Sequence, residues 1–113
     1  MKKYLFICSA NKDRSRTAED YFSTIYNQFR FDSGGTNQKI CNQLGTTFVY
    51  REQLEDADKV FVMESKHKKA IESLFGSVYS KKIKILHIKD IYNYGDKQLK
   101  DVLTKKMENY FNS

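Results

Sequence analysis

Short continuous runs of apolar residues recur along the chain, separated by segments with helical spacing. The runs at residues 3–7, 59–63 and 82–88 predict buried strands, because each has the length of a strand and few polar interruptions. Residues 29–32 predict a shorter strand, which we expect a turn at Gly34-Gly35 to close. The first run is the most continuous, so we expect it at the centre of a parallel sheet.

The segments between these runs repeat their apolar residues at three- and four-residue steps, which predicts helices with one buried stripe each. One helix follows the first strand, a basic helix runs from a Ser65 cap to just before Gly76, and a last helix closes the chain. The residues expected to face the core are Ala18, Tyr21, Phe22, Ile25, Tyr26 and Phe29 in the first helix, Ala70, Ile71, Leu74 and Phe75 in the basic helix, and Leu99, Val102, Leu103, Met107 and Tyr110 in the last.

The middle of the chain is less regular. Residues 39–44 suggest a short helix ended by Gly45. Thr46 or Thr47 then caps a helix that runs to about Asp56. Its inward residues should be Phe48, Leu54 and Ala57.

Strands that alternate with helices predict an α/β three-layer sandwich, a four-stranded parallel sheet with helices on both faces and flavodoxin-like winding. A chain of 113 residues has room for one such core, so we expect a single domain over residues 1–113. The formal net charge of +6 suits an anionic substrate and would also suit nucleic acid.

Cysteine usage and the apolar runs limit the class of protein further. Cys8 and Cys41 are too few for a disulfide framework and show no zinc-ligand spacing with His67 or His87, so we expect no metal and no cofactor. Cys41 is expected to be a buried apolar residue, with a redox partner for Cys8 as the alternative. The amino-terminal apolar run is too short for a secretory leader, and no run could span a membrane, which predicts a cytoplasmic protein without a membrane partner.

Candidate chemistry is concentrated where the first strand meets the first helix. The stretch is Cys8-Ser9-Ala10-Asn11-Lys12-Asp13-Arg14-Ser15. A loop of this length between strand and helix can turn several backbone N–H groups inward as a nest, and the helix adds the positive end of its dipole, so we expect an anion there. Arg14 can grip two oxygens of a phosphoryl group in its planar fork.

The same cradle should hold Cys8 as a thiolate, the nucleophilic form of cysteine, with the Ser15 hydroxyl donating to the sulfur. Asn11 is expected to fix the loop, because asparagine tolerates left-handed backbone angles and bonds across turns. The alternative is that Cys8 is a small core residue ending a strand, since a bare Cys-x5-Arg spacing arises often by chance. The position of the spacing between a strand and a helix favours the phosphate-binding interpretation.

With these residues in view, the chain resembles the low-molecular-weight protein tyrosine phosphatases, whose amino-terminal signature is a Cys-x5-Arg-Ser loop with an Asn three residues after the Cys. Residues 32–36 resemble that family's Ser-Ala-Gly-Thr segment, and residues 57–63 resemble its third strand. The resemblance is strongest to a short bacterial subgroup labelled predicted protein tyrosine phosphatases, in which stretches similar to residues 61–69 and 88–92 recur.

The resemblance implies a catalytic acid in the loop after the fourth strand. Asp90 occupies the place of the Asp in the family's Asp-Pro-Tyr stretch, with Ile91 where the family has proline, which removes a conformational restraint. Asp96 is the alternative acid. Tyr92 and Tyr94 would form aromatic walls for a planar leaving group, or else pack on the last helix.

Two positions of the loop depart from the family. Asp13 stands where many members have a second cysteine that traps the oxidised nucleophile, so that redox protection should be absent. Lys12 stands at a position that is usually apolar or small and that helps select between phosphotyrosine and phosphoarginine. A lysine there favours a substrate with additional negative charge, unless Asp13 neutralises it.

These observations predict a metal-independent phosphatase for phosphate monoesters such as phosphotyrosine, or for a small anionic phosphoester, acting through a cysteinyl phosphate. Cys8 would be the nucleophile, Arg14 would stabilise the transition state and Asp90 would be the acid and then the base, while residues 9–15 bind the phosphate. The alternatives are a nucleotide or cyclic-nucleotide phosphodiesterase on the same fold, and a phosphate or nucleic-acid binding module without activity. Arsenate reduction is disfavoured, because the additional shuttle cysteines are missing.

A cluster of positive residues, Lys66, His67, Lys68 and Lys69, opens the basic helix. We expect it to be a solvated helix face with His67 on the surface. The alternative is a docking patch for an acidic partner or nucleic acid.

Overall fold

The computed structural model describes residues 1–112 and has one four-stranded sheet. The elements in chain order are β1 (Lys3–Cys8), α1 (Arg14–Ile25), β2 (Arg30–Gly35), α2 (Gln38–Leu44), α3 (Arg51–Asp56), β3 (Lys59–Val62), α4 (Ser65–Phe75), the 3₁₀ helix η1 (Ser77–Lys82), β4 (Ile83–Ile85) and α5 (Lys97–Phe111). All strand pairs are parallel and the order is β2-β1-β3-β4, which confirms the predicted sheet and places β1 inside it. Within residues 1–112 no helix has the length and apolar character to cross a membrane.

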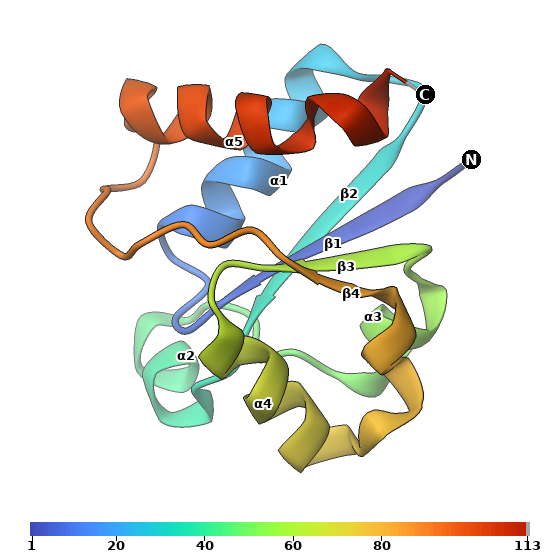
Figure 1. The fold of residues 1–113 in the computed structure, drawn as a ribbon. Coiled ribbons are helices and arrows are strands. Elements are labelled where there is room, and N and C mark those ends of the chain that lie inside the picture. Colours follow the sequence, from blue (N-terminus) through green and yellow to red (C-terminus); the bar gives the residue numbers. More distant parts are fainter. Residues whose placement is uncertain (113) are drawn as a thin grey trace.

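Strand β1 divides its side chains between two cores, as alternation along a strand requires. Tyr4, Phe6 and Cys8 belong to a cluster built with residues of α1 and α5, whereas Leu5 and Ile7 belong to a cluster built with α3, α4 and η1. Figure 1 shows α1 and α5 on one side of the sheet, with α3 and α4 on the other. The predicted three-layer sandwich is confirmed.

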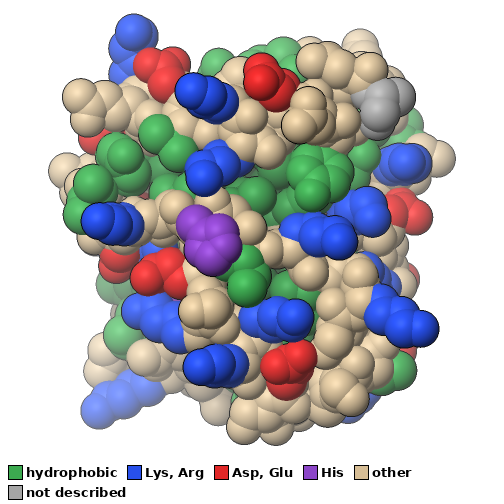
Figure 2. All heavy atoms as spheres, viewed as in Figure 1, with side chains coloured by type: hydrophobic (Ala, Val, Ile, Leu, Met, Phe, Trp, Pro, Cys, Tyr) green, Lys and Arg blue, Asp and Glu red, His purple; other side chains and the backbone are tan. Residues whose placement is uncertain are grey.

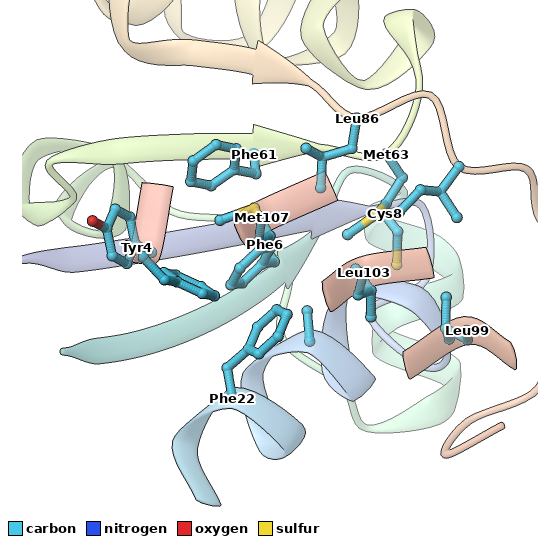
Figure 3. Packing of buried hydrophobic residues seen from close by; sticks show 13 residues of the cluster. Tyr4, Phe6, Cys8, Phe22, Phe61, Met63, Leu86, Leu99, Leu103 and Met107 are labelled. Carbon is cyan, nitrogen blue, oxygen red and sulfur yellow. The ribbon is translucent and has the colours of Figure 1, made fainter. Parts of the chain in front are cut away.

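Aromatic rings fill the core between the sheet and the helices α1 and α5. Phe6 contacts Phe22 of α1 and Phe61 of β3 at centroid distances of 5.8 and 5.6 Å. Figure 3 shows these rings together with Met107 of α5, and with Cys8 at the end of the same row of side chains. The aromatics predicted for the first helix therefore pack on the core, although Tyr26 and Phe29 lie beyond the end of α1 at Ile25. Cys8 is held at the border between this core and the loop that follows.

Strand β2 differs from its prediction. Residues Gly34 and Gly35 do not form a turn; they extend the strand and pair with Ile7 and Cys8 of β1. The physical reason is close approach: a Cβ atom on Gly35 would lie 2.5 Å from the carbonyl oxygen of Ser9 and 2.7 Å from the sulfur of Cys41. Glycine is needed here so that the loop after β1 can lie against β2.

We expect Gly35→Ala to lower the free energy of unfolding by about 1–3 kcal/mol, because an added methyl must displace backbone. Gly34→Ala is the matched control. Its Cβ would lie 3.1 Å from the side-chain oxygen of Gln53 and 3.3 Å from the Cα of Val49, which is a milder overlap. Denaturant unfolding of the two variants checks this. Equal losses would show that the loop does not depend on the close approach at Gly35.

Several boundaries also differ from the predictions. Tyr50, rather than Thr46 or Thr47, precedes α3, because Phe48 forms a bridge with Gly35 and keeps that segment extended. Glu64 rather than Ser65 occupies the cap of α4, although the predicted end before Gly76 is confirmed.

Two predicted core residues, Ile25 and Leu74, are about half exposed, because each lies in the last turn of its helix. Strand β4 ends at Ile85, where the predicted strand ran to residue 88, and His87 has a left-handed φ of 56°, which an extended strand does not allow. The short helix ended by Gly45, with φ 72°, is confirmed.

Candidate active site

The loop between β1 and α1 surrounds a hollow at the carboxyl edge of the sheet. It is a small hollow, about 40 Å³ in volume, which is room for a few waters or one small anion. Its lining residues are Cys8, Ser9, Ala10, Asp13, Arg14 and Asp90. Strand β1 has neighbours on both sides, reached by connections that leave in opposite directions, and ligand sites of open parallel sheets lie at such switch points.

A chain of polar side chains fixes the loop and the sulfur of Cys8. The Sγ of Cys8 and the Oγ of Ser15 are 3.0 Å apart. The side-chain amide of Asn11 donates to Ser15 Oγ and to Ser33 Oγ, both at 2.9 Å, and Asn11 has the expected left-handed backbone with φ 53°. Glu19 extends the chain through Ser33 Oγ at 2.5 Å, and burial raises the pKa of Glu19. The sulfur therefore faces a hydroxyl whose position is set by a buried network.

The carbonyl groups at the start of the loop point outward. Those of Cys8 and Ser9 accept from the backbone N–H groups of Thr36 and Asn37 at 3.0 Å, and that of Ala10 accepts from the Thr46 hydroxyl at 2.6 Å. In a planar trans peptide the N–H points opposite to the C=O. The N–H groups of these three peptide units therefore point away from the donors that bind the carbonyls, toward the inside of the loop. This is the arrangement of an anion-binding nest.

Arg14 is a buried cation held by three oxygen partners. Its Nη1 donates to Glu64 Oε2 at 2.6 Å and to the carbonyl of Ile88 at 2.7 Å, and its Nε lies 3.6 Å from Asp90 Oδ1. The side chain is only 2% exposed, so these partners offset the cost of burying its charge. Both hydrogen bonds use Nη1, which fixes the orientation of the guanidinium plane.

His67 is not on the surface as we expected; it is fully buried behind the loop. Its Nδ1 accepts from the backbone N–H of Glu64 at 3.0 Å, so in the neutral ring Nε2 carries the proton and donates to Ser9 Oγ at 2.9 Å. Burial, and secondly the Arg14 cation, lower the pKa of His67 from 6.5 to about 4. The hydrogen bond from Arg14 lowers the pKa of Glu64.

This burial predicts a pH dependence of stability. Below pH 6.5 the unfolded chain protonates His67, whereas the folded chain does so only near pH 4, so acidification between these values favours unfolding. Relative to His67→Asn, which keeps an acceptor but does not titrate, the wild type should lose about 3 kcal/mol more of its unfolding free energy over that range. Denaturant unfolding at several pH values measures the difference. Parallel pH curves would contradict the assignment of a neutral buried imidazole.

Asp90 and Asp96 occupy different positions. Asp90 lies at the edge of the hollow, 62% exposed, beside Arg14. Asp96 is the cap of α5, where its side chain accepts from the N–H of Gln98 at 3.0 Å, and it does not line the hollow. The geometry therefore favours Asp90 over the alternative acid.

Three further residues predicted for the site, Tyr92, Tyr94 and Lys12, are not among those that line the hollow. Tyr92 is half-buried against the core shared with α1 and α5. Tyr94 donates its hydroxyl to Asp20 Oδ2 at 2.5 Å, and its backbone N–H donates to Asp13 Oδ1 at 2.9 Å. Lys12 is exposed, and residues 1–112 contain no ion pair between Lys12 and Asp13, so the side chain of Asp13 does not neutralise that lysine.

Cys41 is fully buried in α2, with its Sγ 3.7 Å from the carbonyl oxygen of Ser9. Burial raises the pKa of Cys41, so it stays a neutral thiol at neutral pH, in agreement with the predicted buried role. In the part of the chain that the structure describes, no group of three or more His, Cys, Asp or Glu side chains is arranged to hold a metal ion.

Four residues that support the loop were not identified from the sequence: Ser33, Thr46, Glu64 and His67. Glu64 and His67 begin α4 directly after β3, and their three-residue spacing is that of a helix cap, which was a usable signal. Nothing in the sequence around Ser33 or Thr46 indicates a contact with the loop. Their contacts join segments that are far apart in the chain.

Basic side chains are spread over the surface. Figure 2 shows Lys and Arg groups over much of one face, with Asp and Glu groups interspersed among them. A second, more open hollow, of about 220 Å³, adjoins the site and is lined by Glu64, Ser65, His87, Ile88 and Lys89. The two hollows are thus lined by acidic as well as basic residues.

Comparison with known proteins shows which known fold this chain shares. No protein-family model and no curated protein matches the chain. Solved structures do match. A mutant of YwlE from Bacillus subtilis is 21% identical with a TM-score of 0.74, covering 100% of both chains. SP-PTP, a low molecular weight protein tyrosine phosphatase from Streptococcus pyogenes, is 16% identical with a TM-score of 0.75, covering 99% of this chain and 92% of its own.

A third structure is a Cys-to-Ser variant of YwlE arginine phosphatase with a phosphorylated active-site serine. It is 22% identical with a TM-score of 0.74, covering 97% of this chain and 93% of its own. These similarities extend over nearly the whole length of each chain. The protein described here therefore has the fold of the low molecular weight protein tyrosine phosphatases.

Proposed function

We propose that this chain is a cysteine-dependent phosphatase of the low-molecular-weight family that hydrolyses phosphate monoesters without a metal ion. The observation that carries the proposal is the convergence of Cys8, Arg14 and Asp90 on one hollow sized for a small anion. The shared fold with tyrosine and arginine phosphatases supports it. A core cysteine with no chemical role would not require a buried arginine and a nest of amides beside it.

In the first step the Cys8 thiolate attacks phosphorus, so that an S–P bond forms while the P–O bond to the leaving group breaks. The Ser15 hydroxyl, 3.0 Å from the sulfur, stabilises the thiolate by hydrogen bonding. Nη1 of Arg14 is engaged by Glu64 and Ile88, and Nε lies 3.6 Å from Asp90 Oδ1, which is longer than a hydrogen bond. Nη2 and Nε would therefore bind the equatorial oxygens of the phosphoryl group, together with the loop amides. Asp90 donates a proton to the departing oxygen.

In the second step the carboxylate of Asp90 takes a proton from water, and the water oxygen attacks the phosphorus of the cysteinyl phosphate. The S–P bond breaks, which releases inorganic phosphate and returns the thiolate. Asp90 is exposed at the rim, where both a leaving group and water can reach it. The phosphorylated active-site serine of the YwlE variant supports phosphoryl transfer to the corresponding residue in that fold.

The test is hydrolysis of para-nitrophenyl phosphate, phosphotyrosine peptide, phosphoarginine and bis(para-nitrophenyl) phosphate by the wild type in the presence of a chelator. Turnover of monoesters, with a cysteinyl phosphate trapped by acid quench, is the expected result. Turnover of the diester alone would identify the protein as a phosphodiesterase. Absence of turnover with salt-sensitive binding of duplex DNA would identify a binding module.

Asp90→Asn should slow phenyl phosphate far more than para-nitrophenyl phosphate, because a poor leaving group depends most on the donated proton. We expect the loss for phenyl phosphate to be about 10²-fold or more. Asp96→Asn is the matched control and should leave the ratio between the two substrates unchanged, since its carboxylate caps α5. Equal losses for both substrates in Asp90→Asn would exclude Asp90 as the acid.

A further inference from the structure

The loop that carries Asp90 is fixed at its two ends and exposed in the middle. At the start, the N–H groups of Leu86 and Ile88 donate to the carbonyls of Val62 and Met63 at 2.8 and 2.9 Å. Between the ends, the side chain of Ile91 is 71% exposed, whereas that of Tyr92 is half-buried against the core shared with α1 and α5. The position of Asp90 therefore depends on the ion pair with Arg14, on the packing of Tyr92 and on the contacts that fix the far end of the loop.

At the far end, two backbone N–H groups donate to side chains at the start of α1. Tyr94 N–H donates to Asp13 Oδ1 at 2.9 Å, and Gly95 N–H donates to Thr17 Oγ1 at 3.0 Å. Asp13 occupies the cap position of α1, yet its side chain makes no capping hydrogen bond to that helix. An aspartate at a helix cap ordinarily accepts from its own helix, so this carboxylate is committed to the loop instead.

The position of Asp13 has an electrostatic cost that its structural role explains. Asp13 is one of the residues that line the hollow beside Arg14, and a carboxylate near a bound anion opposes it by like-charge repulsion. A neutral residue would avoid that repulsion. The hydrogen bond that Asp13 Oδ1 accepts from the N–H of Tyr94 connects this carboxylate to the Asp90 loop.

We propose that Asp13 is a positioning residue that holds the Asp90 loop over the phosphate loop, so that proton donation by Asp90 depends on the hydrogen bond between Asp13 and Tyr94. The inference rests on the proposed phosphatase function. It joins a residue of the anion cradle to the loop that carries the acid, across 81 positions of the chain. Asp13 acts through Asp90 and does not itself transfer a proton.

The first arm of the experiment needs no activity. Amide hydrogen exchange of Tyr94, followed by NMR on the full chain, should be about tenfold faster in Asp13→Ala than in the wild type, because the amide loses its acceptor. Asp13→Asn keeps a side-chain oxygen as acceptor and should stay close to the wild type. Asp101→Ala, at an exposed aspartate on α5, is the matched control. Unchanged exchange at Tyr94 in Asp13→Ala overturns the proposal, whatever the activity.

The second arm compares rates with phenyl phosphate and para-nitrophenyl phosphate. Asp13→Ala should lower the phenyl phosphate rate about tenfold more than the para-nitrophenyl phosphate rate, and Asp13→Asn should restore the wild-type ratio. In the Asp90→Asn background, Asp13→Ala should change the ratio no further, since the group it positions is absent.

Equal losses on both substrates, or a further change of the ratio in the double variant, overturn the positioning role. Failure of the proposed function looks different: the wild type would then hydrolyse neither substrate, which removes the role of Asp90 together with that of Asp13, while the exchange arm still reports whether the hydrogen bond holds the loop.

Discussion

Replacing Cys8 with serine should abolish turnover of phosphate monoesters, with a loss of about 10⁴-fold or more, because a neutral hydroxyl replaces the thiolate. Binding of phosphate or tungstate should remain measurable by calorimetry, since Arg14 and the loop amides are unchanged. The variant should keep its fold, because serine can preserve the contact with Ser15 that the sulfur makes at 3.0 Å. A fully active Cys8→Ser variant would exclude the cysteinyl-phosphate mechanism.

Cys41→Ser provides the matched control, because it replaces the other cysteine of the chain, a buried thiol whose pKa is raised by burial. It should retain monoester turnover. Iodoacetate should inactivate the wild type by alkylating Cys8, with protection by inorganic phosphate, and should leave Cys41 unmodified. Inactivation that follows alkylation of Cys41 would show that our proposal assigns the reactive thiol to the wrong residue.

Replacing Arg14 with lysine should reduce kcat/KM by about 10²–10³-fold, although the formal charge is conserved. A lysine carries a single ammonium group, which cannot bind Glu64 and the Ile88 carbonyl and also present two further donors to a phosphoryl group. Oxyanion affinity, measured in the Cys8→Ser background, should fall as well. Those two measurements together test transition-state and ground-state binding by the same side chain.

Arg16→Lys is the matched control for this change, because Arg16 lies on the same helix, is 45% exposed and forms long ion pairs with Glu19 and Asp20, at 3.9 and 3.7 Å. It should leave kcat/KM within about twofold, as surface pairs contribute little. Unfolding experiments on both variants separate a loss of activity from a loss of stability. Wild-type activity in Arg14→Lys would mean that charge alone, without the planar fork, is sufficient.

The sequence was informative where a local pattern and the tertiary role coincide. The apolar run of β1 and the Cys-x5-Arg spacing after it indicated the edge of the sheet at which the site lies, and Asn11 has the left-handed backbone that its residue type favours. The alternation of strands with helices along the chain predicted the parallel sheet. These features depend on residues close together in the chain, so their physical consequences can be derived from the sequence.

The sequence was misleading where contacts between distant segments determine the structure. A Gly-Gly pair favours a turn locally, but at Gly35 the requirement is the approach of the Ser9 carbonyl, which no local pattern contains. His67 stands among lysines, which suggested a solvated position; its burial follows from contacts with Ser9 and Glu64. The pairing of Arg14 with Glu64 joins residues 50 positions apart and was equally hidden.

The polar chain from Cys8 through Ser15 and Asn11 to Ser33 is made entirely of the protein's own side chains. The entropic cost of ordering the cradle is therefore met during folding and not during binding. A preorganised cradle of this kind would contact the phosphoryl group alone and would not distinguish between the groups attached to it. Under the proposed function, free inorganic phosphate should compete with substrate, and discrimination between substrates should come from exposed residues beside the cradle, such as Lys12 and Asp90.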